Sequence, residues 1–184
     1  MIKNNEIEFK CPVTKKQYED LLKKFELEYN VYSQTNYYFD SENQDLLKEK
    51  TTLRIRHKMP NSYKLTMKSC APQGYLEQSV FLRAEEAQEL IENGFNLEPF
   101  FERNLDVKFY GKLNNDRVST PYRDGELFLD KIEYFGIVDY EIEYEVDNYE
   151  VGEKDFEKFL TENNIKLKKA KRKSQRVFEY VSGQ

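Results

Sequence analysis

The sequence predicts an α+β fold in which antiparallel β-strands make up most of the structure. At least six segments alternate apolar and polar residues, which is the pattern of a strand with one buried face. Short turn motifs separate several of these segments, so neighbours in the chain can pair as antiparallel hairpins. A few other segments repeat apolar residues at helical spacing, and these predict helices packed beside the sheet.

Strands are expected to dominate the first half of the chain. Thr14 and Gln17 fit a capping box, and apolar residues at helical spacing follow them. A Pro60-Asn61 turn separates two alternating segments, which predicts a hairpin, and Gly94 provides a helix stop. The expected elements are strands at 5–10, 27–39, 52–58, 63–68 and 75–83 and helices at 14–25 and 84–93.

The clearest strand lies in the second half, where residues 139–146 alternate acidic and apolar side chains over their whole length. Residues 95–110 show no regular pattern beyond a short helix near 99–104. The other expected elements are strands at 111–120 and 126–135, a helix that begins after Gly152, and one or two helical turns at 174–181.

The composition predicts one domain, residues 1–184, with enough apolar material for a core. Apolar residues make up 39% of the chain and charged residues 34%, which is more charge than a typical globular protein carries. The N-terminus lacks the apolar run of a signal peptide, and no apolar segment has the length of a membrane span. We therefore expect a soluble, cytoplasmic protein that does not bind membranes.

Several classes of site find little support in the composition. The single histidine, His57, falls on the apolar side of its strand, which argues for packing and against histidine-based zinc or nucleophile sites. Cys11 and Cys70 have neither disulfide-framework nor metal-ligand spacing, so both are expected to be structural. The net charge of -5 gives no basic field for nucleic acid. The exception is a basic cluster from Lys166 to Arg176, expected to be a solvated helix face.

Charged residues of one sign gather in rows on the predicted strands. Acids dominate the first and last strands, whereas bases dominate the strands between them. An open sheet with one face in water explains the alternation of any single strand. Such a sheet normally intersperses opposite charges, however, because like charges directly opposite each other are destabilising. A row of carboxylates calls for a counterion such as a divalent metal, and a closed barrel would turn the charged rows into a polar lumen.

Such a lumen would suit a ligand with many negative oxygens and a bound cation, such as a polyphosphate. Phosphoryl transfer depends mainly on positioning and charge neutralisation. Carboxylates bind Mg²⁺ or Mn²⁺, arginines hold phosphate oxygens through two hydrogen bonds, and lysines act as point charges. The candidates are Glu6, Glu8, Glu141 and Glu143 for the metal, Arg54 and Arg56 for bidentate contacts, and Lys10, Lys64 and Lys68 as point charges.

The motif Glu6-x-Glu8-x-Lys10 resembles the signature of the CYTH family, the triphosphate tunnel metalloenzymes. This family includes class IV adenylyl cyclases, thiamine triphosphatases and inorganic triphosphatases. The chain looks most like the CYTH proteins of Gram-positive bacteria. Later residues follow in the family's order over nearly the whole chain: Arg54-x-Arg56, Lys64, Lys68, Glu77, Arg117, Asp130 and Glu141-x-Glu143.

The resemblance implies a closed eight-stranded antiparallel β-barrel, a tunnel with a charged interior flanked by helices, in which triphosphate and a divalent metal bind. It adds Asp130 to the metal ligands, Arg117 and Lys173 to the triphosphate ligands, and Lys10, Glu77 and Arg117 as catalytic residues. Lys171 and Arg176 are alternatives to Lys173. Because Arg117 is out of phase with Lys112 and Asn114, either a bulge intervenes or only one of these groups points inward.

We therefore expect a metal-dependent phosphohydrolase that acts on a small-molecule triphosphate, with inorganic triphosphate favoured over nucleoside or thiamine triphosphate. The alternatives are a cyclase that makes cyclic AMP from ATP and a non-catalytic binder of a phosphorylated ligand. Nothing in the sequence indicates an oligomeric state. Two further sets of residues are assigned outside the site: Tyr37, Tyr38, Tyr140 and Tyr144 to packing, and Asp139, Glu145 and Asp147 to strand ends.

Overall fold

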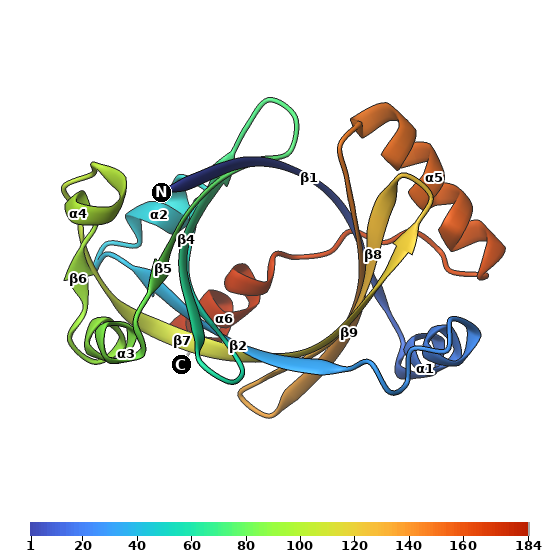
Figure 1. The fold of residues 1–184 in the computed structure, drawn as a ribbon, viewed down its shortest axis with the longest axis horizontal. Helices are drawn as coiled ribbons and strands as arrows, with labels where there is room; N and C mark the ends of the chain where they lie inside the picture. The colour runs from blue at the N-terminus through green and yellow to red at the C-terminus, as the bar shows by residue number, and fades with distance from the viewer. Residues whose placement is uncertain (184) are drawn as a thin grey trace. The chain divides into compact units, whose positions relative to one another are not determined.

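The computed structural model describes residues 1–183, and its strands pair as a closed antiparallel ring (Figure 1). The hydrogen-bonded order is β2-β3-β4-β5-β1-β9-β8-β7, and a further pairing of β2 with β7 closes it. The short β6 adds to the outside of β7. This is the eight-stranded barrel topology that was expected. The strands are β1 Ile2–Val13, β2 Tyr32–Asp40, β3 Thr52–Lys58, β4 Ser62–Cys70, β5 Tyr75–Leu82, β6 Phe95–Asn96, β7 Asp106–Tyr122, β8 Gly125–Tyr134 and β9 Ile137–Val146.

The chain divides into two compact units, and β1, β2 and β7 each contribute to both. Unit 1 comprises residues 1–5, 34–113 and the C-terminal segment from Arg172, and unit 2 comprises Glu6–Ser33 and Asn114–Lys171. A single domain for the whole chain stays a prediction. The helices of unit 1 are α2 Asp45–Lys48, α3 Ala84–Asn93, α4 Glu98–Phe101 and α6 Lys173–Ser182; those of unit 2 are α1 Lys15–Lys24 and α5 Tyr149–Glu162.

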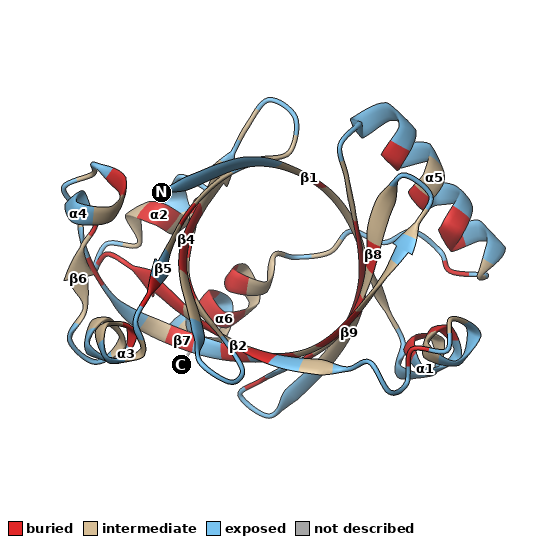
Figure 2. Ribbon diagram, viewed as in Figure 1, coloured by how far each residue is buried: buried red, intermediate tan, exposed pale blue. Residues whose placement is uncertain are grey.

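The core of unit 2 lies between the apolar face of its strands and the helices α1 and α5. The expected capping box begins α1, because the Thr14 hydroxyl accepts from the Gln17 amide and the Gln17 side chain accepts from the Thr14 amide. Both helices bury one side (Figure 2). Tyr140 and Tyr144 pack here as expected. The buried helical residues are Tyr18, Leu21, Phe156, Phe159 and Leu160, which meet Leu127, Leu129 and Ile142 of the strands.

The prediction that a helix begins after Gly152 is wrong, because α5 begins at Tyr149 and contains that glycine. Asn148 caps the helix, its side-chain oxygen accepting from the Val151 amide at 3.0 Å. A Cβ atom on Gly152 would lie 2.4 Å from a methyl carbon of Val146. The glycine therefore permits close approach between helix and strand and does not mark a helix boundary.

Unit 1 has its own core, in which Leu53, Ile55 and Leu65 are fully buried with residues of α3. His57 lies on the same side of β3 and stacks on Tyr63, with ring centroids 4.3 Å apart. The packing role expected for this histidine is thus confirmed.

Several element boundaries differ from the prediction. β2 begins at Tyr32 and not at residue 27, and β7 begins at Asp106 and not at 111. The helix α2 was not predicted; it forms where the Asp40 carboxylate accepts from the Leu46 and Leu47 amides, each at 2.9 Å. Residues 166–172 of the basic cluster are not helical, so the expected helix face begins only at α6. No helix within residues 1–183 has the length and apolar character to cross a bilayer.

The two cysteines are expected to differ sharply in reactivity. Cys11 is 0% exposed and its Sγ lies 3.6 Å from the Lys166 carbonyl oxygen, whereas Cys70 is exposed. Burial raises the pKa of the Cys11 thiol, which suppresses its thiolate form. A disulfide reagent such as Ellman's should therefore titrate one thiol rapidly in the native protein and two in denaturant. Rapid labelling of the native Cys70→Ser variant would contradict this assignment.

Candidate functional site

The charged residues of unit 2 share one face of β1, β9 and β8. Paired residues of antiparallel strands point to the same side, so the register decides which charges meet. Ile142 and Leu129, on the opposite face, are buried in the core. The pairs that bring charges together are Lys10 with Glu143, Glu8 with Glu145 and Asp130 with Glu141.

Two groups of three carboxylates form on this face. In each group, one oxygen from every residue lies within 4.8 Å of the others. The group that contains Glu6 is partly exposed, and the group that contains Asp130 is buried. An all-carboxylate donor set fits a hard divalent cation such as Mg²⁺ or Mn²⁺ and does not fit a soft metal. The groups are Glu6, Glu8 and Glu145, and Asp130, Glu141 and Glu143.

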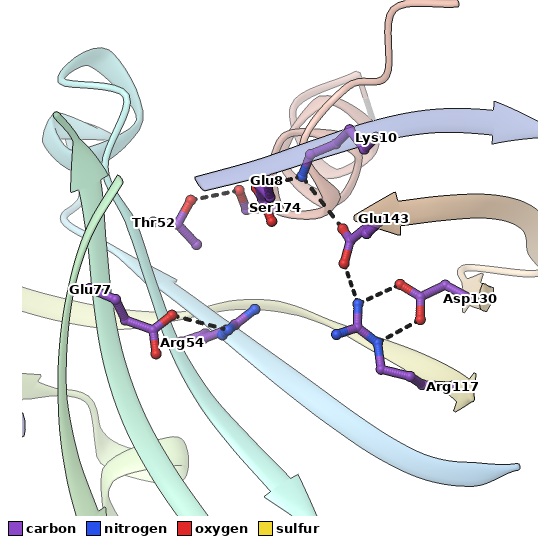
Figure 3. A network of polar contacts seen from close by, with 9 residues as sticks. All are labelled: Glu8, Lys10, Thr52, Arg54, Glu77, Arg117, Asp130, Glu143 and Ser174. Atoms are coloured by element: carbon purple, nitrogen blue, oxygen red, sulfur yellow. Dashed lines mark hydrogen bonds and ion pairs between the residues drawn. The ribbon is translucent and has the colours of Figure 1, made fainter. Parts of the chain in front are cut away.

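Arg117 enters the buried group from β7 (Figure 3). Its Nε and Nη2 donate to the two carboxylate oxygens of Asp130, each at 2.7 Å, and Nη2 also donates to Glu143. The residue is 6% exposed, and its guanidinium lies over the Phe128 ring. Burial alone would lower the pKa of Arg117, but the carboxylates of Asp130 and Glu143 outweigh it and raise that pKa further. Arg117 is therefore a permanent cation that neutralises part of the cluster.

Lys10 of β1 lies within reach of both groups. Its Nζ is 2.8 Å from Glu8 and 3.5 Å from Glu143. Burial opposes the charged form, yet the carboxylates of Glu143, Glu8 and Glu141 raise the pKa of Lys10 above its ordinary value. Lys10 is consequently an ammonium ion at neutral pH and cannot accept a proton.

Arg117 points to the opposite side of β7 from Asn114, and no bulge lies between the two residues. The β7–β8 register runs unbroken from Asn114 opposite Glu133 to Tyr122 opposite Gly125. Lys112, of the other parity, is exposed. Of the two alternatives, the one in which only one group points inward is therefore correct.

Glu145 is the residue that sequence reasoning missed. It was expected near a strand end outside the site, but its carboxylate joins those of Glu6 and Glu8. Burial, followed by the negative charge of Glu6, raises the pKa of Glu145 to about 8. The only sequence signal was its shared parity with Glu143, which cannot say how far along the strand the cluster extends. Asp139 does lie apart and accepts a hydrogen bond from the Tyr134 hydroxyl.

Unit 1 carries a basic cluster, also on one face of its strands. Glu77 is the acid within this cluster and lies 3.1 Å from Lys64. It also lies 3.8 Å from Arg54, a contact drawn in Figure 3. Burial works to raise the pKa of Glu77, but Arg54, Lys64 and Lys68 outweigh it and hold that pKa below its usual range. Three bases, Arg54, Lys64 and Lys68, therefore surround one ionised carboxylate. The register pairs that place them are Arg56 with Lys64, Arg54 with Thr66, and Lys68 with Glu77.

The N-terminus of α6 lies beside this basic face. The Ser174 hydroxyl is 3.0 Å from that of Thr52, which pairs with Lys68 in the sheet. Lys173, the first residue of the helix, is half-buried, whereas Lys171 precedes the helix and is exposed. Arg176 lies in the first turn of α6. A role for Lys173 stays a prediction.

Comparison of the sequence with known protein families shows which family the chain belongs to. The CYTH domain model matches residues 4–178. The chain belongs to the CYTH family. CYTH enzymes use a divalent metal ion, and the carboxylate groups described above have the donor chemistry for one.

Relatives of this CYTH chain match it over nearly their full lengths. It is 31% identical over 180 residues to the "Putative triphosphatase YjbK" of Bacillus subtilis, covering 95% of this chain and 94% of that protein. A solved "putative adenylate cyclase" of Bacillus halodurans is 32% identical, with a TM-score of 0.88 over 97% of this chain and 100% of that one. The Hippeastrum protein HpAC1, named a "putative adenylyl cyclase" with a dominant triphosphatase activity, is 23% identical, with a TM-score of 0.77 over 97% and 96%.

Proposed function

We propose that this CYTH protein is a divalent-metal-dependent triphosphatase that cleaves a terminal phosphoanhydride bond, with inorganic triphosphate the favoured substrate. The observation that carries the proposal is the separation of charge. Six carboxylates gather on one face of unit 2, and three bases surround a single acid on one face of unit 1. The names of the Bacillus subtilis relative and of HpAC1 support the same activity.

The carboxylates of unit 2 are assigned to the metal. Glu6, Glu8, Asp130, Glu141 and Glu143 are the proposed ligands, and Glu145 joins them. Bound Mg²⁺ or Mn²⁺ would neutralise phosphate oxygens and lower the pKa of a coordinated water.

The bases are assigned to phosphate oxygens. Arg54 and Arg56 would bind them through two hydrogen bonds, and Lys64, Lys68 and Lys173 would act as point charges. Lys10 and Arg117 remain protonated beside carboxylates, so their proposed role is to stabilise developing negative charge and not to abstract a proton. Glu77, ionised between Lys64 and Arg54, would hold these two cations in position.

Purified protein is expected to release phosphate from tripolyphosphate in the presence of Mg²⁺ or Mn²⁺ and to lose this activity in chelator. Released phosphate should be measured for tripolyphosphate, ATP, GTP and thiamine triphosphate with each metal. Failure to hydrolyse any of the four with either metal would overturn the proposed activity. Thermal stabilisation by tripolyphosphate without turnover would instead indicate a binding protein.

A cyclase is the second candidate, favoured by the name of the Bacillus halodurans structure. The two activities differ in their products from ATP. Cyclic AMP with pyrophosphate would identify a cyclase, whereas ADP with phosphate would identify the proposed hydrolase. Chromatography of the reaction products separates the two outcomes directly.

A further inference from the structure

The polar face of unit 1 continues from the basic strand β3 onto β2, a strand without lysine or arginine. The register pairs Asn36 with Arg56 and Gln34 with Lys58, so both amides share the face of the phosphate-binding candidates. Tyr37 points the other way and packs against the core. Asn36 is 0% exposed and Gln34 is 4% exposed, which is deep burial for amide side chains.

The amide nitrogens of both residues lack an acceptor within residues 1–183. Neither Nδ2 of Asn36 nor Nε2 of Gln34 has a hydrogen-bond partner there, and the same holds for the buried Nε of Arg54 on this face. A buried N–H group without an acceptor is unfavourable. A face that holds three such donors is therefore suited to a ligand that is rich in acceptors.

The oxygen of the Asn36 amide is already engaged. Oδ1 accepts a hydrogen bond from Nε of Arg56 at 2.9 Å. A guanidinium has donors and no acceptor, so the amide cannot turn round and offer its nitrogen to Arg56 instead. It is therefore the nitrogen of Asn36, and not its oxygen, that is left for a ligand.

We propose that Asn36 and Gln34 are substrate-binding residues whose amide nitrogens donate hydrogen bonds to phosphate oxygens of the triphosphate. This proposal rests on the triphosphatase function and adds two uncharged donors, the amide pair, to the cationic ones. A hydrogen bond to an ionised oxygen is roughly twice as strong as a neutral one. Amides suit this buried position because a buried lysine would need a carboxylate partner in the free protein, whereas an amide does not.

Gln34→Met tests the amide pair without a change of charge. Methionine keeps the length of the side chain but has no N–H group. Calorimetric titration with the methylene-bridged analogue of tripolyphosphate in Mg²⁺ should show binding that is weaker by about 10-fold. The Tm of the ligand-free variant should equal or exceed that of the wild type, because the substitution removes a buried donor that lacks an acceptor.

The matched control for this substitution is Gln78→Met in the same unit. Gln78 of β5 pairs with Met67, which is packed in the core, so its side chain lies on the opposite face from Glu77. The analogue should bind to Gln78→Met with an affinity within about 2-fold of wild type, because the substitution leaves the polar face intact.

Two substitutions of Asn36 separate direct binding of phosphate from an effect through Arg56. Asn36→Asp keeps an oxygen for Arg56 but replaces the Nδ2 donor by a negatively charged oxygen, whereas Asn36→Ala removes both groups. If Nδ2 binds phosphate, aspartate should weaken binding of the analogue more than alanine does. A role confined to holding Arg56 predicts the reverse order, because aspartate retains that contact.

These outcomes separate the amide pair from the proposed activity. Unchanged affinity of Gln34→Met, an equal loss in Gln78→Met, or a ligand-free Gln34→Met protein that unfolds well below the wild type would overturn the role of Gln34. Asn36→Asp that binds the analogue more tightly than Asn36→Ala would overturn the role of Asn36. The expected losses in a protein that hydrolyses no triphosphate would keep the amide pair and overturn the hydrolase. No binding of the analogue to the wild-type protein would overturn both.

Discussion

Replacing Arg117 by methionine is expected to lower the free energy of unfolding by about 3–5 kcal/mol, because it removes one partner of a buried ion pair. Asp130 is fully buried and Glu143 nearly so, and both would lose a guanidinium that donates directly to them. Methionine keeps much of the volume of the arginine side chain, so the decrease in the free energy of unfolding measures the effect of removing the charge. For a chain of this size the shift in Tm should be on the order of 10 °C, measured by thermal unfolding in chelator.

A matched control exists on the same pair of strands. Lys131 of β8 lies 3.5 Å from Asp116 of β7, but both side chains are more than one-third exposed. Lys131→Met should therefore cost less than about 1 kcal/mol. Added Mg²⁺ or Mn²⁺ should stabilise Arg117→Met more than the wild type, since the metal would replace the missing cation. Equal destabilisation by the two substitutions would show that Arg117 does not compensate the buried acids.

Glu143→Gln is expected to reduce kcat for tripolyphosphate hydrolysis by at least about 100-fold. The amide keeps the shape of the side chain but removes a negative oxygen from the buried carboxylate group, and it weakens the contacts to Arg117 and Lys10. Glu6→Gln, in the other group, should have a similar effect. Phosphate release should be followed across a titration of each metal, because a weakened metal site shifts the concentration needed for activity.

The control for this experiment is Glu133→Gln. Glu133 is exposed and points to the opposite side of β8 from Asp130, so the change removes the same charge without touching either carboxylate group. Its kcat should stay within about 2-fold of wild type. Thermal unfolding of all variants shows whether a variant is inactive although it is folded or inactive because it does not fold. A folded Glu143→Gln protein that retains more than half of its activity would remove Glu143 from the proposed metal ligands.

Much of the fold could be predicted from local patterns. The capping box at Thr14, the hairpin of β3 and β4 and the glycine that ends α3 depend on residues close together in the chain, and all three were confirmed. The predicted ends of helices and strands were wrong where packing between distant residues determines them. Gly152 looks like a helix boundary in sequence, but the close approach of Val146 places it inside α5.

The sequence by itself determined which residues share a face, because side chains on a strand alternate with a period of two. That rule grouped Glu6 with Glu8, and Arg54 with Arg56, before any pairing was known. Only the tertiary structure decided which faces meet at which register: it brought Glu145 to Glu6, joined Arg117 to Asp130, and placed Asn36 beside Arg56. Strand register is set by contacts between residues far apart in the chain, and shifting it by one residue reverses every side chain. The alternation of side chains along a single strand therefore cannot predict its register with another strand.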